Sequence, residues 1–184
     1  MQRTIENQSE ANPFETNAVG SAPPPWYGIR TKPNHENLAA TSLEGKGYEQ
    51  YAPVYRSRRR WSDRIVEASL PLFPSYVFCR FEASRRLPIL ITPGVLSIVG
   101  FGNGPTPISD SEIEAIQRIL SSGLAAEPAP FLREGQRIRV VKGALEGLEG
   151  ILIKKKTDWR MVVSVTMLQR AVSVEIDHDW IRKI

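Results

Sequence analysis

Apolar and polar positions follow two different periods along the chain, which predicts two structural units. Between Trp26 and Ser122, short apolar runs of strand type alternate with segments of helical period, as in an α/β layer. The clearest strand is Ser75–Phe81, because it is rich in β-branched and aromatic residues and holds no breaker. After residue 130 the helical period is lost. Four short strand patterns follow there and predict a small β-barrel, at 136–142, 150–155, 161–167 and 171–176.

Three helices are expected in the first unit, over about 35–43, 83–91 and 109–122. The third has the strongest signals. Ser109 and Glu112 have the spacing of a capping box, in which each side chain bonds the backbone of the other residue. Apolar residues then recur at helical spacing, at Ile113, Ile116, Ile119 and Leu120.

Proline and glycine mark the limits of the two units. Residues 1–24 are polar and end in the triple proline 23–25, so we expect a flexible tail. The segment 123–130, with the sequence GLAAEPAP, is expected to be a linker. The predicted fold class is therefore α+β, with an α/β domain at 25–122 and a small β-domain at 131–184.

Composition excludes several classes of protein. The 184 residues carry a formal net charge of +4 and an ordinary share of apolar residues, which excludes a wholly disordered chain. No apolar run reaches the ~18–20 residues of a membrane span, and residues 1–20 lack the pattern of a secretory signal. The single cysteine, Cys79, excludes an internal disulfide framework and a multi-cysteine zinc site. We therefore expect a cytoplasmic protein.

The positive charge is concentrated in one segment. Residues 56–64 (RSRRRWSDR) hold five arginines and one aspartate, a net charge of +4. Arginine forks beside a tryptophan suit a phosphate backbone and an unpaired base. The alternative is a solvated loop that only aids solubility, and the residues alone leave both interpretations open.

No catalytic site can be assembled from the residue types present. The two histidines, His35 and His178, have no partner group in a suitable pattern, and Cys79 lies inside the strongest strand, as a structural thiol would. Asp177 and Asp179 flank His178, but in an extended segment they point away from it. Glycine-rich phosphate loops are absent from the sequence. We expect no enzyme activity, no cofactor and no metal.

The aromatic residues around 70–78 (LPLFPSYVF) form a second candidate site. Phe73 and Pro74 come just before a strand on which Tyr76 and Phe78 project to one face. Such a cluster is either an anchor for a partner or ordinary core. The residues alone do not decide between the two.

Several motifs, in this order, resemble NusG-type transcription elongation factors. They are Trp26-Tyr27 at the start of a strand, LFPSYVF at 72–78, TPGV at 92–95 and PISDSE at 107–112. The segment 135–150 (GQRIRVVKGALEGLEG) resembles the KOW module of the same family. The arginine-rich insertion and the Pro-Ser-Tyr form are most similar to the specialised UpxY/RfaH-like antiterminators of polysaccharide operons.

The resemblance implies a fold and a polymerase site. The first domain would be the NGN α/β sandwich, ferredoxin/RNP-like, and the second an SH3-like KOW barrel. In the family the NGN domain docks an apolar pocket on the clamp helices of the RNA polymerase β′ subunit. The matching positions are Phe73, Pro74, Tyr76 and Phe78, with Trp26 and Tyr27 as walls.

The resemblance also implies a contact with the non-template DNA strand. Lys32 and Thr92 match positions that touch this strand in the family, and the arginines of the 56–64 segment would lie on the same side: Arg56, Arg58, Arg59, Arg60 and Arg64. Leu90 and Ile91 depart from the polar residues that are usual before this threonine. Arg85 and Arg86 occupy the place of a motif that contacts the polymerase β subunit in specialised relatives, without matching it.

For the KOW module, the resemblance implies a protein partner, which is the termination factor Rho or a ribosomal protein in housekeeping members. Gly143, Gly147 and Gly150 match its turn glycines. We expect a monomer that suppresses pausing or termination. Two alternatives stay open: a housekeeping factor with the opposite effect, and a translation-associated RNA-binding KOW protein.

Overall fold

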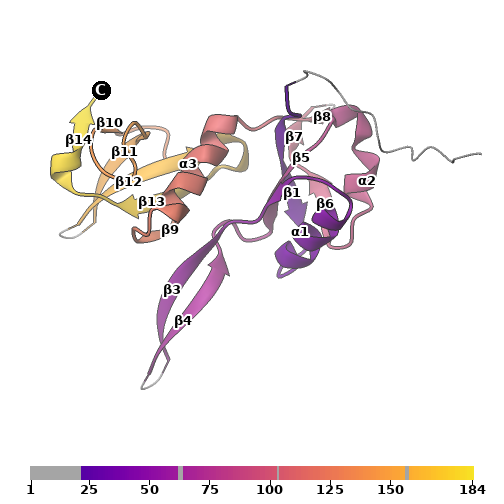
Figure 1. The fold of residues 1–184 in the computed structure, drawn as a ribbon, viewed down its shortest axis with the longest axis horizontal. Helices are drawn as coiled ribbons and strands as arrows, with labels where there is room; N and C mark the ends of the chain where they lie inside the picture. The colour runs from indigo at the N-terminus through magenta and orange to yellow at the C-terminus, as the bar shows by residue number, and fades with distance from the viewer. Residues whose placement is uncertain (1–21, 62–63, 103, 156–157) are drawn as a thin grey trace, which may run out of the picture.

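A computed structural model describes residues 22–61, 64–102, 104–155 and 158–184. Two separate antiparallel sheets dominate it, one in each half of the chain (Figure 1). The mixed α+β class predicted from the sequence is confirmed. Among the described residues, no helix is long and apolar enough to cross a membrane.

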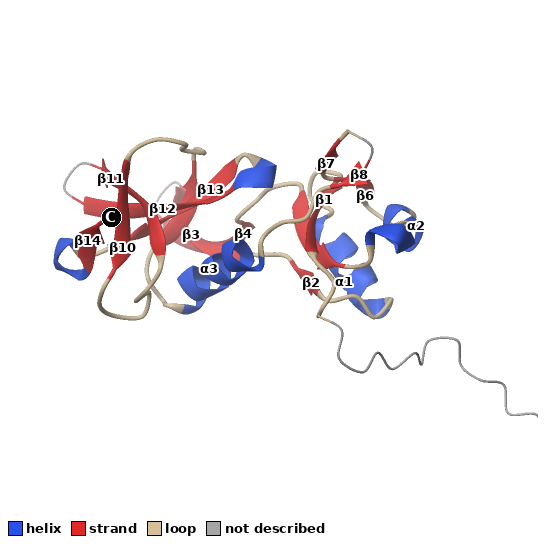
Figure 2. Ribbon diagram, turned by 90° about the horizontal axis from the view of Figure 1, so that it is seen from above, coloured by secondary structure: helices blue, strands red, loops and turns tan. Residues whose placement is uncertain are grey.

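The N-terminal sheet has a ferredoxin-like order of elements. Its four strands run in the order β2-β5-β1-β6 (Gln50–Tyr51, Tyr76–Arg80, Trp26–Thr31 and Val95–Ile98). Helices α1 (Glu36–Gly45) and α2 (Leu87–Leu90) pack on one face of this sheet. Figure 2 shows both helices on the side that points away from the C-terminal sheet. A 3₁₀ turn at Ala83–Arg85 precedes α2, and a short hairpin follows β6, formed by β7 (Gly100–Phe101) and β8 (Gly104–Pro105).

A long β-hairpin is inserted between β2 and β5. Its strands are β3 (Val54–Trp61) and β4 (Arg64–Pro71), and it projects from the body of the molecule (Figure 1). Pro53 separates β2 from β3, where the sequence predicts one strand from Tyr48 to Tyr55. The Pro53 carbonyl accepts a hydrogen bond from the Leu72 N–H at 2.8 Å, which closes the base of the hairpin. We call β3–β4 the arginine hairpin.

Helix α3 (Asp110–Ser121) forms where the sequence predicts it but packs elsewhere. It lies against β12 of the C-terminal sheet instead of completing the N-terminal layer (Figure 1). The predicted capping box is wrong: the Ser109 side chain makes no cap and pairs with the Ser111 hydroxyl at 2.7 Å. The Glu112 carboxylate instead accepts hydrogen bonds from Thr166.

The C-terminal half is an all-β unit of six strands, in the order β14-β10-β11-β12-β13-β9. The four predicted strands appear as β10 (Gln136–Val140), β11 (Glu149–Lys155), β12 (Asp158–Val165) and β13 (Arg170–Glu175). β14 (Ile181–Lys183) follows the 3₁₀ turn His178–Trp180, and another such turn, Thr166–Leu168, joins β12 to β13. The expected linker differs from the prediction, because its residues Ala126–Ala129 form β9 and pair with β13.

One apolar cluster runs through both halves of the chain. It contains Trp26 and Phe78 from the N-terminal sheet, the α3 isoleucines, and Val165, Leu168 and Val172 from the C-terminal unit. A separate cluster fills the space between the N-terminal sheet and α1 and α2. The two halves therefore touch through buried apolar surface in this structure.

Candidate polymerase- and nucleic-acid-binding surfaces

Strand alternation gives the N-terminal sheet two chemically different faces. Side chains at successive positions of a strand point to opposite sides of the sheet. Tyr27 and Cys79 thus join the cluster under α1 and α2, whereas Trp26 and Phe78 join the cluster on the other side. Because both helices cover the first side, the second side must be covered by something else. We call this second side, with Phe73 and Tyr76, the aromatic face.

Four of the predicted polymerase-binding aromatic residues lie together on the aromatic face: Trp26, Phe73, Tyr76 and Phe78. The Phe73 and Phe78 rings meet edge to face, with centroids 5.7 Å apart, and Tyr51 stacks on Phe78 at 6.2 Å. Tyr76 packs against the same cluster while staying partly exposed, and Pro74 is exposed. Tyr27 does not belong to this group, because it packs on Phe81 on the opposite face, 4.5 Å away.

The aromatic face is buried in this arrangement of the two halves. Phe73 is 2% exposed, and Phe78 is fully buried. Leu168, on the turn between β12 and β13, lies over β1, where a Cβ on Gly28 would come within 2.8 Å of the Leu168 Cδ2. The absence of a side chain at Gly28 thus lets Leu168 reach the sheet. Phe73 and Phe78 are therefore enclosed in this arrangement, as core residues are, while Tyr76 keeps part of its surface.

Polar contacts reinforce this covering of the face. The Thr166 hydroxyl donates to the Glu112 carboxylate at 2.9 Å, which ties the Leu168 turn to α3. Arg118 of α3 donates to the Glu146 carbonyl at 2.6 Å. At the other end of α3, Arg80 from β5 pairs with Asp110 at 2.8 Å and lies over the Trp26 ring. Helix α3 therefore contacts both halves.

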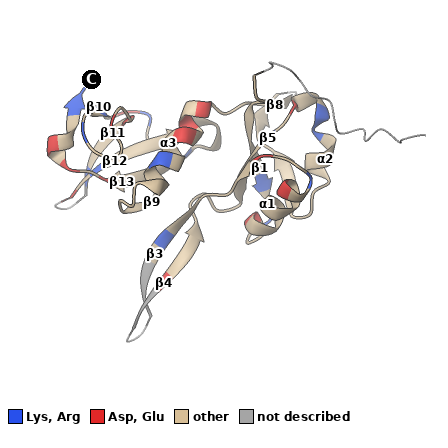
Figure 3. Ribbon diagram, viewed as in Figure 1, with Lys and Arg blue, Asp and Glu red and all other residues tan. Residues whose placement is uncertain are grey.

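The predicted DNA-binding residues fall into two separate places. Arg56 is exposed near the base of the arginine hairpin, where the described part of β3 carries positive charge (Figure 3). Arg58, Arg59 and Arg60 continue β3, and Arg64 begins β4, while residues 62–63 lie outside the described part of the chain. Thr92 lies instead at the turn between α2 and β6. Lys32 follows β1 and is tied to that turn, because its N–H donates to the Gly94 carbonyl at 2.8 Å.

Thr92 is buried and fully engaged within the domain. Its hydroxyl donates to the Pro88 carbonyl at 2.8 Å and accepts from the Lys46 ammonium at 2.7 Å. Only 3% of Thr92 is exposed. A base could not reach this hydroxyl in the present structure. Sequence reasoning could not have shown this, because Lys46 lies far from Thr92 along the chain.

Two further sets of predicted residues have clear positions. Arg85 and Arg86 are exposed in the 3₁₀ turn and at the start of α2. Gly143 and Gly147 both have a φ of +83°, in the left-handed region that favours glycine. Gly150 needs its small size for another reason, since a Cβ there would lie 2.6 Å from Met161 Cγ and 2.7 Å from the Val162 carbonyl oxygen.

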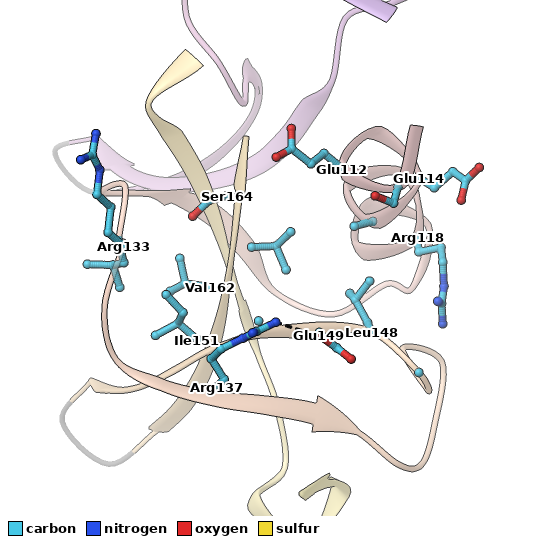
Figure 4. Close-up of a pocket in the computed structure, with 16 residues that line it drawn as sticks. Glu112, Glu114, Arg118, Arg133, Arg137, Leu148, Glu149, Ile151, Val162 and Ser164 are labelled. Atoms are coloured by element: carbon cyan, nitrogen blue, oxygen red, sulfur yellow. Dashed lines mark hydrogen bonds and ion pairs between the residues drawn. The ribbon is translucent and has the colours of Figure 1, made fainter. Parts of the chain in front are cut away.

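A groove between α3 and the C-terminal sheet was not predicted from the sequence. It encloses about 690 Å³ and is lined by Glu112 and Arg118 from α3, by Arg137 and Val162 from the sheet, and by Leu148 from the turn before β11 (Figure 4). Arg137 and Arg139 both pair with Glu149, and the hydrogen bond from Arg139 is the first cause of the lowered pKa of that carboxyl. No local sequence signal could have shown the groove, because the packing of α3 creates it.

The titratable groups give no indication of catalysis. Burial raises the pKa of the Cys79 thiol to about 12, and the nearby Glu49 carboxylate adds to the rise, so the thiol stays protonated and unreactive. His178 stacks on Trp159, with ring centroids 4.9 Å apart, and Asp177 accepts from the Asp179 N–H. In the described part of the chain, no three His, Cys, Asp or Glu side chains are grouped as metal ligands.

Comparison with known proteins gives a consistent result. The profile of the NusG family, described as "Transcription termination factor nusG", matches residues 24–117. The Helicobacter pylori transcription termination/antitermination protein NusG is 26% identical over 174 residues, which cover 86% of this chain and 98% of its own. The NusG proteins of Escherichia coli K12 and Thermus thermophilus are each 27% identical and cover 86% of this chain, and 95% and 97% of their own. A solved structure entitled "Domain interaction in Thermotoga maritima NusG" matches 87% of this chain and 97% of its own at 20% identity, with a TM-score of 0.49.

The family profile spans half of the chain, and the relatives match at nearly their full length. The chain therefore belongs to the NusG family. It is a NusG-like transcription termination/antitermination factor and not an enzyme, as the sequence predicted. The relation to the specialised UpxY/RfaH-like members stays a prediction.

Proposed function

We propose that this protein binds RNA polymerase during elongation through its aromatic face and suppresses pausing or termination. The docking partner would be the clamp helices of the β′ subunit. Phe73 and Phe78 are the central anchors, and Pro74, Tyr76 and Trp26 lie around them. Aromatic residues of this kind dominate the energy of protein interfaces.

The observation that carries the proposal is the one-sided covering of the N-terminal sheet. Helices α1 and α2 shield only the face of Tyr27 and Cys79, so the aromatic face needs a partner in every state of the protein. In this structure the aromatic face is covered by the turn that carries Leu168 together with α3. In the elongation complex polymerase would cover it instead, after the C-terminal unit has moved aside. Tyr27 is not part of this proposed interface, because it lies on the helix-covered face.

In this proposal the domain at 25–122 binds polymerase and DNA, and the KOW unit at 131–184 recruits a further protein through its free surface. A ribosomal protein and Rho are the candidates that the family resemblance suggests. Arg85 and Arg86, being exposed beside α2, would contact the β subunit. The target would be a dedicated operon, such as one for polysaccharide synthesis.

The test is a transcription assay with the full chain on a template that carries a pause site and a terminator. We expect the chain to bind the reconstituted elongation complex and to increase readthrough. If the chain binds the elongation complex but increases termination, it would instead be a housekeeping factor that works with Rho. Strong binding to free structured RNA with no affinity for the elongation complex would support the ribonucleoprotein alternative and overturn the proposal.

The arginine hairpin is proposed to hold the DNA backbone. Five arginines lie in residues 56–64, and the hairpin that carries them projects from the body of the molecule (Figure 1). Contacts of arginine with phosphates give affinity without sequence choice, and they make the affinity depend on salt.

Replacing Arg58, Arg59 and Arg60 together by serine is expected to weaken binding to the elongation complex at low salt. Loss of three phosphate contacts should lower the slope of log Kd against log salt by about 2, since each contact with a single strand contributes ~0.7. The measurement is a salt titration of binding. A matched control removes the same charge from the C-terminal unit, with Lys154, Lys155 and Lys183 replaced by serine. Equal slopes for the two triple variants would contradict a specific role for the hairpin.

A further inference from the structure

The turn that leads from the arginine hairpin into β5 is fixed by the segment between β1 and α1. This turn consists of residues 72–75 (LFPS), and we call it the proline turn. Ser75 closes it with a φ of +67°, in the left-handed region that a residue with a side chain rarely adopts. The Ser75 N–H donates to the Glu36 carboxylate at 2.6 Å, and the Ser75 carbonyl accepts the Thr31 N–H at 2.9 Å. Both backbone groups of Ser75 are therefore bonded to another part of the chain.

The carboxylate of Glu36 is buried, which is unusual for an acidic side chain. Glu36 is the first residue of α1 and is 6% exposed. No other charged residue is buried among those whose side chains the structure describes. Burying a carboxylate is costly unless it accepts hydrogen bonds, and the start of a helix favours a negative charge. The bond to Ser75 thus offsets part of the cost of keeping Glu36 inside.

The proline turn sets the positions of three residues of the proposed polymerase interface. At the hairpin end, the turn is closed by the bond to the Pro53 carbonyl. At the other end, the Tyr76 N–H donates to the Phe73 carbonyl at 3.1 Å, and Pro74 is exposed between them. A change of φ at Ser75 would turn Pro74 and Phe73 relative to β5. The geometry of the interface therefore depends on the left-handed conformation of Ser75.

We propose that Glu36 is a positioning residue for polymerase binding, because its carboxylate holds Ser75 in the left-handed conformation and so presents Phe73 and Pro74 in the form that polymerase binds. This inference rests on the proposed function. Glu36 is too deeply buried to touch polymerase itself and acts through Ser75. A turn that is already ordered before binding loses less conformational freedom in the complex, which raises the affinity.

The variant Glu36→Ala is expected to weaken binding of the full chain to the elongation complex about tenfold, because serine without this bond populates the left-handed region only rarely. Adding Ser75→Gly to this variant should restore the affinity to within about threefold of wild type, since glycine adopts a positive φ without steric cost. Affinity is measured at a temperature at which urea unfolding shows each variant to be folded. Glu44→Ala is the matched control, because it removes the same charge from an exposed position of α1.

A second variant tests the same bond from the other side. Ser75→Val leaves the Glu36 carboxylate in place, but a β-branched residue resists a positive φ, so binding should again weaken about tenfold or more. The variant alters a half-exposed turn position and no core side chain, so it tests the inference even if Glu36→Ala does not fold.

Each result supports or overturns the inference. Weaker binding of Glu36→Ala that Ser75→Gly largely restores, with Glu44→Ala unchanged, supports it. Wild-type affinity in Glu36→Ala or in Ser75→Val overturns it and leaves Glu36 a role in stability alone. A loss in Glu36→Ala that Ser75→Gly does not reduce would show that Glu36 does not act through Ser75, which also overturns it. Failure of wild type to bind any elongation complex would instead overturn the proposed function, and this inference with it.

Discussion

Replacing Leu168 with glutamate is expected to separate the two halves of the chain and to raise its affinity for the elongation complex. Leu168 is buried against β1 at Gly28, in a cluster that offers it apolar contacts. An uncompensated carboxylate there costs at least about 3 kcal/mol, which shifts the ratio of open to closed forms by more than about a hundredfold. Since only the open form exposes the aromatic face, its larger population raises the apparent affinity.

Small-angle scattering and binding to the elongation complex measure the two parts of this prediction. The radius of gyration should rise, and hydrogen exchange should become faster at β5, which carries Phe78. Ile184→Glu is the control, because the same charge is added to the C-terminal unit at a side chain that is 52% exposed. A Leu168→Glu chain with the scattering curve and affinity of wild type would show that this contact does not limit access to the aromatic face.

The substitution Phe73→Ala is expected to lower both the stability of the protein and its affinity for the elongation complex. Phe73 is enclosed and meets Phe78 edge to face, so its truncation should lower the free energy of unfolding by about 3–5 kcal/mol. As an interface anchor it should also cost about 2 kcal/mol or more in binding, which is roughly a thirtyfold loss of affinity. Urea unfolding and elongation-complex binding of the full chain measure the two losses.

A conservative variant of Phe73 distinguishes an interface anchor from a residue that only fills the core. Phe73→Leu keeps most of the buried volume, so its stability should fall by less than about 1.5 kcal/mol. It removes the aromatic ring, so an anchor role predicts a clear loss of binding at nearly normal stability. If Phe73→Leu binds as wild type does, and Phe73→Ala loses binding only in proportion to its unfolded fraction, then Phe73 is only a core residue.

Local sequence patterns predicted those features that depend on local physics. Strand alternation correctly placed Tyr76 and Phe78 on one face, and the same rule should have separated Trp26 from Tyr27, which the resemblance grouped as two walls of one pocket. The isoleucine period predicted the limits of α3 well. Pro53 shortened the second strand because proline has no N–H to donate to a neighbouring strand.

Contacts between segments far apart along the chain account for the features that the local patterns did not predict. Glu112 has the spacing of a capping residue, but Thr166, far along the chain, offers it two donors, so the capping box does not form. Thr92 is withdrawn from solvent by Lys46, which no local pattern connects to it. The segment 126–129 looks like a linker by composition and becomes a strand because the edge of β13 is open to it. In each case a tertiary partner competes successfully with the local preference.

The position of α3 determines where the molecule can bend. The isoleucine side of α3 is buried with β12, and Arg118 and Glu112 both bond to the C-terminal unit. The polar link from α3 to the N-terminal sheet is the Arg80–Asp110 ion pair. If the two halves part at their weakest junction, α3 would travel with the C-terminal unit, and the pivot would be residues 106–109, not the proline-rich segment after the helix. Such a short pivot keeps a displaced C-terminal unit tethered near the aromatic face at high local concentration, so this unit would cover the face again soon after polymerase leaves.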